Sequence, residues 1–223
     1  EDPALPGGLS LQFTEPLRLA LGDPTGALGA TDVHGDGSFA ADVVAIDDLV
    51  VGLGAMLDPA PALSAVGLEA AATTLIYDSR HVGMDPRLPL DDARVYALPS
   101  AWLDDLGTAL GTAALLTRAP GAGSIREAGY LVGQVVDAEG VPVAGARLVL
   151  EPPELEDGLW YPDGALRSSG GDATGPEGLF LLVHDGEDVQ SFSFTLEGAA
   201  PAPPYRGVLA RERGLLLRVG EPP

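Results

Sequence analysis

The 223-residue chain carries 33 acidic against 12 basic side chains, a formal net charge of −21, and 46% hydrophobic residues. This charge disfavours nucleic acid and anionic lipid headgroups as partners, because both are bound mainly through cationic side chains. The sequence has no cysteine and no lysine, which excludes disulfides, thiolate metal sites, Schiff-base chemistry and a P-loop lysine.

No apolar run reaches the roughly 18–20 residues that a membrane-spanning helix needs. The sequence starts at Glu1 with neither an initiator methionine nor an apolar leader, which we interpret as a mature or trimmed product whose targeting segment has been removed or left out. We therefore expect an extracellular, cell-surface or periplasmic location. A lipid anchor, if the protein carries one, is expected outside this chain.

The first half, residues 1–118, is predicted to form an N-terminal β-sandwich-like domain. Short apolar runs broken by Gly, Pro and Asp predict its strands, at residues 17–21, 40–45, 49–57 and 73–77. The alanine-rich residues 60–72 predict a loop with one helical turn. A Gly-containing turn, a Phe-bearing strand and an acidic turn follow one another at 30–48 and again at 173–188, which indicates a weak internal repeat.

One amphipathic helix is predicted at residues 100–111, with Ser100 as a capping candidate. Apolar side chains recur on one of its faces, namely Trp102, Leu103, Leu106 and Leu110. Two interpretations stay open. The helix is either a connector that packs this face on the first domain or a site for a protein partner.

Residues 119–128 contain Pro120 and two glycines and are predicted to link two domains. The segment that follows, residues 129–223, is predicted to be a second domain rich in short strands. Turn residues separate its candidate strands at the spacing of an antiparallel sandwich, and the strands lie at residues 130–136, 146–150, 179–184, 191–196, 207–211 and 215–219.

A specific pattern of glycines, turn residues and apolar residues covers residues 129–219. It consists of Gly133, Asp137, Glu139, Gly140, Pro142, Gly145, Ala146, Leu148, Leu150, Thr174, Gly178 and Phe180. This pattern resembles the carboxypeptidase regulatory-like family of transthyretin-type β-sandwiches, and the resemblance implies a domain without catalytic residues. The predicted fold class is mostly β, with two antiparallel β-sandwich (transthyretin- or Ig-like) domains and one short connecting helix.

The segment that begins at Asp32 has the start of a calcium-loop pattern, with Asp32 and Asp36 as oxygen ligands and glycine at the sixth position. His34 at the third position is a poor ligand for Ca²⁺, and the twelfth position, where a bidentate carboxylate is required, is Val43. A turn between strands explains the same residues. We expect no cofactor, with calcium at Asp32 and Asp36 as an alternative.

Trp160 and Tyr161 are adjacent aromatics in a Gly- and Pro-rich segment. Aromatic rings exposed on a loop stack on sugar rings or anchor a protein partner. The alternative is that one ring caps the sandwich and the other covers a loop. This pair is the candidate ligand site of the chain.

The sequence lacks a recognisable catalytic constellation. Its histidines, His34, His81 and His184, show no metal-ligand spacing, and no Gly-x-Ser-x-Gly elbow is present. Neighbouring acidic pairs, at residues 47–48, 91–92 and 104–105, are explained by solvated turns, because adjacent side chains do not face each other across a cleft. We therefore predict that the protein is not an enzyme.

These observations favour an exported structural or protein-interaction scaffold at a bacterial cell surface. A protein partner or self-assembly is expected, because a positive mean hydropathy in so charged a chain indicates an apolar surface for a partner to cover. The first alternative is a carbohydrate- or peptide-binding module that uses Trp160 and Tyr161. The second is a calcium-dependent adhesion domain that uses Asp32 and Asp36.

Overall fold

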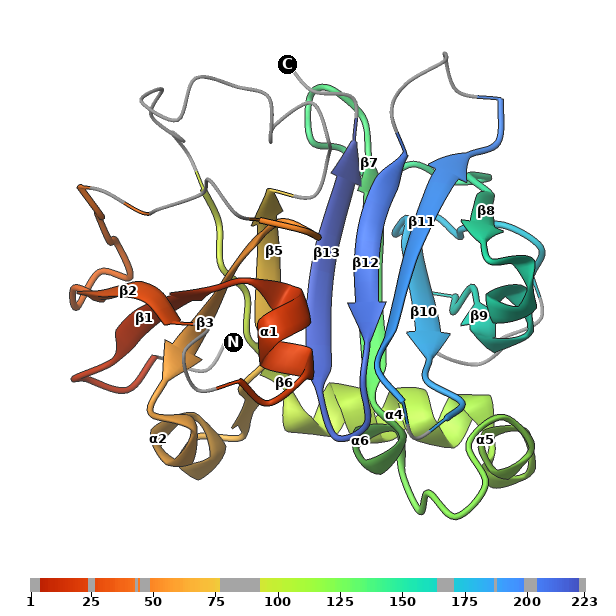
Figure 1. The fold of residues 1–223 in the computed structure, drawn as a ribbon, viewed down its shortest axis with the longest axis horizontal. Coiled ribbons are helices and arrows are strands. Elements are labelled where there is room, and N and C mark those ends of the chain that lie inside the picture. Colours follow the sequence, from red (N-terminus) through yellow and green to blue (C-terminus); the bar gives the residue numbers. More distant parts are fainter. Residues whose placement is uncertain are drawn as a thin grey trace.

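The computed structural model describes residues 5–23, 27–42, 44, 49–76, 93–163, 171–186, 188–198 and 204–220. Within these ranges strands dominate (Figure 1). The mostly β fold class predicted from the sequence is confirmed. In the described part of the chain, no helix is both long and apolar enough to span a bilayer.

An eight-stranded sheet runs through the described fold. Its strands are β1 (Ser10–Thr14), β2 (Ala27–Asp32), β3 (Leu53–Asp58), β5 (Ala72–Ile76), β7 (Tyr130–Val136), β9 (Leu159–Trp160), β10 (Leu179–Val183) and β13 (Gly214–Gly220). Their order in the sheet is β2-β1-β3-β5-β13-β7-β10-β9. Strands from both halves of the chain therefore share one sheet, and they meet where β5 pairs with β13.

Strand β13 differs from the antiparallel arrangement predicted for the C-terminal strands. It pairs in parallel with β7 along its whole length, from Gly214 opposite Tyr130 to Gly220 opposite Val136. On its other side it pairs in parallel with β5. The apolar pattern predicted that a strand exists here but not which strands flank it, because parallel neighbours are joined by long crossover connections.

A three-stranded antiparallel sheet covers one face of the large sheet. It consists of β8 (Leu148–Glu151), β11 (Gln190–Leu196) and β12 (Tyr205–Leu209), in the order β12-β11-β8, and Figure 1 shows β11 and β12 in front of the large sheet. The two sheets enclose one apolar core, which includes Leu131, Val135, Leu148, Leu150, Phe180, Leu182, Phe192, Phe194, Leu215 and Leu217. Two sheets therefore pack face to face in the C-terminal half.

Three helices cover the opposite face of the large sheet. They are α4 (Ser100–Leu110), α5 (Thr112–Arg118) and α6 (Ile125–Ala128), at the lower edge of the view in Figure 1. The helix predicted at residues 100–111 is confirmed as α4, and its buried residues Leu103, Leu106 and Leu110 face a second core. The segment 119–128 packs Ala119, Ala122, Ile125 and Ala128 into the same core.

The central strands bury side chains on both faces. In β10, Phe180 and Leu182 point into the core between the sheets, whereas Leu181 and Val183 point toward the helices. All four are at most 1% exposed. Burial on both faces explains why these strands are continuous apolar runs in the sequence instead of alternating polar and apolar residues.

The strand predicted at residues 17–21 is wrong, because this segment forms the short helix α1 (Pro16–Ala20). Glu15 caps this helix by accepting a hydrogen bond from the Arg18 backbone N–H over 2.9 Å. Proline is favourable at the first helical position, since its missing N–H has no helical partner there. The cap and Pro16 outweigh the alternation of apolar residues that predicted a strand.

The N-terminal strands enclose a third apolar core, formed by residues such as Leu11, Phe13, Leu53, Leu57 and Leu63. The single helical turn predicted in 60–72 is α2 (Ala60–Ala65), and beyond it lies a small sheet of β4 (Leu68–Glu69) and β6 (Leu98–Pro99). The strand predicted at 73–77 is observed as β5, with Tyr77 outside the described residues. None of the described residues within 40–45 belongs to a strand.

Candidate functional site

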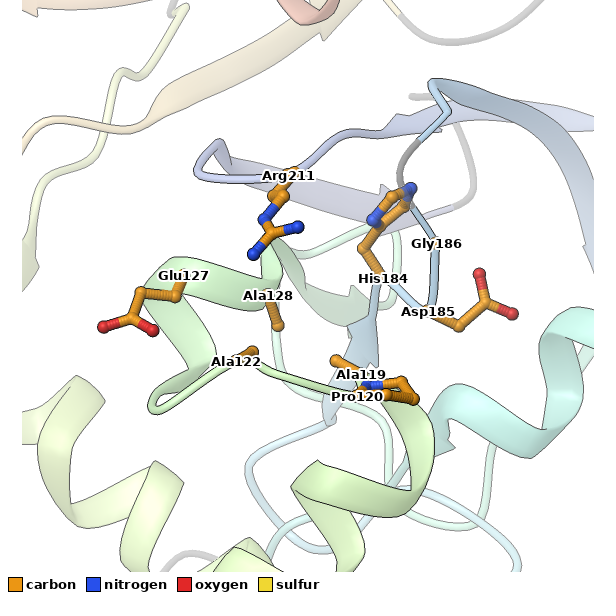
Figure 2. A pocket seen from close by; sticks show the side chains of 9 residues that line it. All are labelled: Ala119, Pro120, Ala122, Glu127, Ala128, His184, Asp185, Gly186 and Arg211. Carbon is orange, nitrogen blue, oxygen red and sulfur yellow. The ribbon is translucent and has the colours of Figure 1, made fainter.

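A hollow of about 220 Å³ lies beside α6, where β10 ends and the turn between β12 and β13 passes. Small side chains from the segment 119–128 line one part of it. His184, Asp185, Glu127 and Arg211 contribute the polar groups (Figure 2). This hollow is the strongest candidate for a site among the described residues, and sequence reasoning did not predict it.

His184 follows the last residue of β10 and is only 1% exposed. Its backbone N–H donates to the Gly129 carbonyl over 3.0 Å, and its Nε2 lies 2.7 Å from the Asp188 carbonyl oxygen. A carbonyl only accepts, so Nε2 carries the hydrogen and Nδ1 is left without one in the neutral ring. Nδ1 is buried without a partner among the described residues. The imidazole thus ties the end of β10 to the loop that follows.

Arg118 and Asp185 form an ion pair next to His184. The Arg118 Nη1 lies 3.0 Å from the Asp185 Oδ2, and the Arg118 side chain is 12% exposed. Gly158 makes room for this guanidinium, because a Cβ at residue 158 would lie 2.6 Å from the Arg118 Nε. The pair connects the end of α5 to the end of β10, so its geometry serves the packing of the helices on the sheet.

Glu127 belongs to the cap of α6. Its Oε2 accepts from the Gly123 N–H over 2.7 Å, and its own N–H donates to the Ser124 Oγ over 3.2 Å. A helix cap of this kind satisfies N–H groups that the helix itself leaves unpaired. The carboxylate is therefore already engaged at the rim of the hollow.

The turn that carries Arg211 is held close to the hollow. Glu212 has a φ of +59°, and the Arg213 N–H donates to the Ala210 carbonyl over 3.3 Å. A Cβ on Gly129 would lie 1.9 Å from the Ala210 carbonyl oxygen, so only glycine fits beneath this turn. Figure 2 shows the Arg211 and His184 side chains above the same end of the hollow.

Trp160 and Tyr161 do not form an exposed aromatic pair, which was one of the two interpretations that the sequence left open. Tyr161 is 8% exposed and lies in the core between the two sheets, where its hydroxyl accepts from the Leu148 N–H over 2.9 Å. Burial raises the pKa of Tyr161, and the hydrogen bond from Leu148 offsets only part of that rise.

Trp160 is half-buried at the end of β9 and packs against the core on the helix side. Because successive side chains alternate across a sheet, the Trp160 ring and the Tyr161 ring lie on opposite faces. They cannot offer one stacking surface in this arrangement. The alternation was not foreseen, since the segment was interpreted as a loop.

Asp32 is the last residue of β2, and Asp36 lies on the exposed turn that follows. The Asp36 Oδ1 accepts from the Ser38 N–H over 2.9 Å and from the Ser38 Oγ over 2.7 Å. These hydrogen bonds lower the pKa of Asp36. Among the described residues, no three His, Asp or Glu side chains gather as ligands of a metal ion. Asp36 therefore acts as a turn-capping residue here.

The remaining candidates lie apart. His34 is exposed on the turn that holds Asp36, and Asp104 forms an ion pair with Arg126. His81 and the acidic pairs at 47–48 and 91–92 fall outside the described residues. Among the described candidate residues, only His34 and Asp36 share a turn, and only His184 lies at the hollow.

A comparison with protein-family models finds no match for this chain, and a search of curated proteins finds none either. The resemblance to the carboxypeptidase regulatory-like family therefore stays a prediction.

Proposed function

We propose that this chain is a non-enzymatic structural or protein-interaction scaffold, exported and placed at a bacterial cell surface. The observation that carries the proposal is how the ionisable side chains around the hollow are used. His184 binds the Asp188 carbonyl through Nε2, Asp185 binds Arg118 through Oδ2, and Glu127 caps α6. The His184 Nδ1 and the Asp185 Oδ1 are buried without a partner among the described residues. A general acid or base has to reach a substrate proton. Side chains engaged in holding helices and strands together support a structural role instead.

The proposal also assigns a sandwich architecture to each half of the chain. We infer that residues 129–219 are a carboxypeptidase regulatory-like sandwich, with β7, β9, β10 and β13 facing β8, β11 and β12. The first 118 residues then form a second sandwich-like unit that continues the large sheet through β5. The enclosed core between the two sheets of the C-terminal half supports this assignment.

The charge of the chain supports an exported scaffold whose partner is a protein. A net charge of −21 keeps a surface soluble and repels phosphate-rich polymers. A protein partner with a basic face is favoured by the same field. The proposed partner is therefore another surface protein. Self-assembly, the alternative, requires an apolar contact that outweighs the repulsion between two copies of this charge.

Labelling of intact cells tests the location. An antibody against the purified chain is expected to label the bacteria that make the protein before permeabilisation, whereas an antibody against a cytosolic enzyme labels them only afterwards. Label that appears only after lysis, in the cytosolic fraction, contradicts the proposal.

Cross-linking on those cells tests the scaffold role. Because the chain has no lysine, the reagent must react with carboxylates instead of amines. The expected product is an adduct of the chain with another surface protein or with itself. Recovery of the uncross-linked monomer alone, under conditions that cross-link a known surface complex, contradicts it.

Two binding assays separate the alternatives. A glycan array that gives a signal lost in Trp160→Ala supports the carbohydrate-binding alternative. Calorimetric titration with Ca²⁺ that gives a saturable signal, lost in Asp32→Asn and Asp36→Asn, supports the adhesion alternative. The scaffold proposal expects neither signal.

A further inference from the structure

Strand β13 occupies an unusual place for the last described strand of a chain. It lies inside the eight-stranded sheet, with β5 on one side and β7 on the other, and it runs parallel to both (Figure 1). The register with β7 covers every residue from Gly214 to Gly220. Any tension that reaches the chain beyond residue 220 is therefore applied directly to a central strand.

The strand directions place the first and last strands in the same orientation. β1 is antiparallel to β3, β3 is antiparallel to β5, and β5 is parallel to β13. β1 therefore runs in the same sense as β13. The start of β1 and the end of β13 therefore lie toward opposite ends of the sheet, so a pull on the two flanks of the chain draws the end of β13 away from the end at which β1 starts.

This geometry decides how hydrogen bonds share a load. A pull along a strand shears all the hydrogen bonds that flank it at once, whereas a pull across the strand breaks them one after another. The bonds on both sides of β13 lie between apolar layers, since Leu215, Leu216, Leu217 and Val219 are at most 4% exposed. A low-dielectric environment strengthens hydrogen bonds and excludes the water that would replace them.

The exit end of β13 is also fixed by side chains. The Tyr205 hydroxyl donates to the Gly220 carbonyl over 3.0 Å, and the Arg218 Nη2 donates to the Gly140 carbonyl over 2.7 Å. The first bond joins β12 to the end of β13, and the second joins β13 to the turn after β7. They hold the last residues of β13 where tension would enter.

We propose that β13 is a mechanical clamp: tension applied through the residues before β1 and after β13 is borne by shear between β13 and its two parallel neighbours. The source of that tension rests on the proposed scaffold role at a cell surface, where a chain links an anchored side to a bound partner. The resistance itself is a property of the fold.

Single-molecule pulling in two directions tests the clamp. Because the natural chain has no cysteine, engineered cysteines supply unique attachment points. The shear geometry uses handles at the two ends of the full chain. The peeling geometry uses the C-terminal handle and Glu139→Cys, on the exposed turn after β7, so that the Val136–Gly220 end of the ladder opens first.

At equal loading rate, the shear geometry is expected to require at least about twofold the rupture force of the peeling geometry, since forced unfolding reports the barrier along the pulling direction. Equal forces in both directions, or a lower force in shear, overturn the proposal.

Variants of the exit end give a second test. Tyr205→Phe and Arg218→Met are expected to lower the shear force. Arg147→Met is expected to leave it unchanged, because it removes exposed ion pairs of a residue that lies just before β8. Denaturant unfolding of each variant separates a mechanical effect from general destabilisation. Unchanged shear force in both exit-end variants overturns the role assigned to these bonds.

The experiments can overturn the clamp and the scaffold role independently of each other. A low shear force overturns the clamp and leaves the labelling and cross-linking results standing. A cytosolic location overturns the scaffold proposal and leaves the ratio of the two forces standing.

Discussion

A Cβ atom at residue 133 would lie 2.0 Å from the Cζ of Phe180, so the Phe180 ring lies across the bare backbone of Gly133. The two residues are register partners in β7 and β10. The same arrangement recurs in the smaller sheet, where a Cβ on Gly207 would lie 2.4 Å from the Cζ of its partner Phe192. Each of the two sheets around the C-terminal core therefore contains a cross-strand pair in which a phenylalanine ring packs on a glycine.

Gly133→Ala is expected to lower the free energy of unfolding by about 3 kcal/mol, because the added methyl group overlaps the Phe180 ring in a packed core. Urea unfolding followed by tryptophan fluorescence measures the change. Gly35→Ala is the control, since nothing lies within 4 Å of a Cβ there, and its effect is expected to stay within about 0.5 kcal/mol.

A double-mutant cycle identifies the cause. If the overlap with Phe180 is responsible, Phe180→Leu together with Gly133→Ala costs clearly less than the sum of the two single changes. Additive costs would show that Gly133 is required for another reason.

Glu15 is a second buried position with a specific role. It is 1% exposed, and its two oxygens accept from the N–H groups of Arg18 and Val51, each over 2.9 Å. Glu15→Ala leaves both donors unpaired and is expected to cost about 2–4 kcal/mol. Thermal unfolding of this variant beside exposed Glu177→Ala checks the prediction, and equal melting temperatures for the two variants would contradict it.

Because Tyr130 titrates at a higher pH in the folded chain than in the unfolded chain, the free energy of unfolding falls at alkaline pH. Burial, with the nearby Glu69 carboxylate, raises the pKa of Tyr130 to about 12, whereas an unfolded tyrosine titrates near pH 10. Between about pH 10 and 12 only the unfolded chain loses this proton, so the stabilisation is complete below pH 10 and is lost as the pH rises through 12. The total loss is about 2–3 kcal/mol.

Denaturant unfolding at a series of pH values from 8 to 12 measures this dependence. Tyr130→Phe is expected to remove most of the alkaline slope, with a smaller part left because burial also raises the pKa of Tyr161. An unchanged slope in Tyr130→Phe would show that Tyr130 does not cause it.

Much of the C-terminal half could be predicted from the sequence. The run at 130–136 is observed as β7 with the same bounds, and the predicted runs near β10, β11, β12 and β13 differ from the observed strands by no more than two residues at either end. These segments are buried and bounded by Gly, Pro or Asp turns, so local pattern and tertiary packing favour the same structure. The helix α4 was predictable for the same reason.

The sequence did not predict other parts of the structure, for both local and long-range reasons. At residues 17–21 the alternation of leucines resembles a strand, but Glu15 and Pro16 start a helix. The sequence left open whether the Trp160 and Tyr161 rings are exposed, because nothing in a Gly- and Pro-rich segment shows that β9 pairs with β10. The hollow at His184 gathers residues from the segment 119–128, the segment just after β10 and the turn before β13, which no spacing in the sequence connects.

The central position of β13 between β5 and β7 is the feature on which both the fold and the clamp depend most. Amide hydrogen exchange measures it directly, because the amides of strands at the centre of a fold open only with global unfolding. We predict that Leu215, Leu216, Leu217 and Val219 are among the slowest-exchanging amides of the chain, as slow as those of β7. Fast exchange along β13, at rates typical of an edge strand or a loop, would contradict the account.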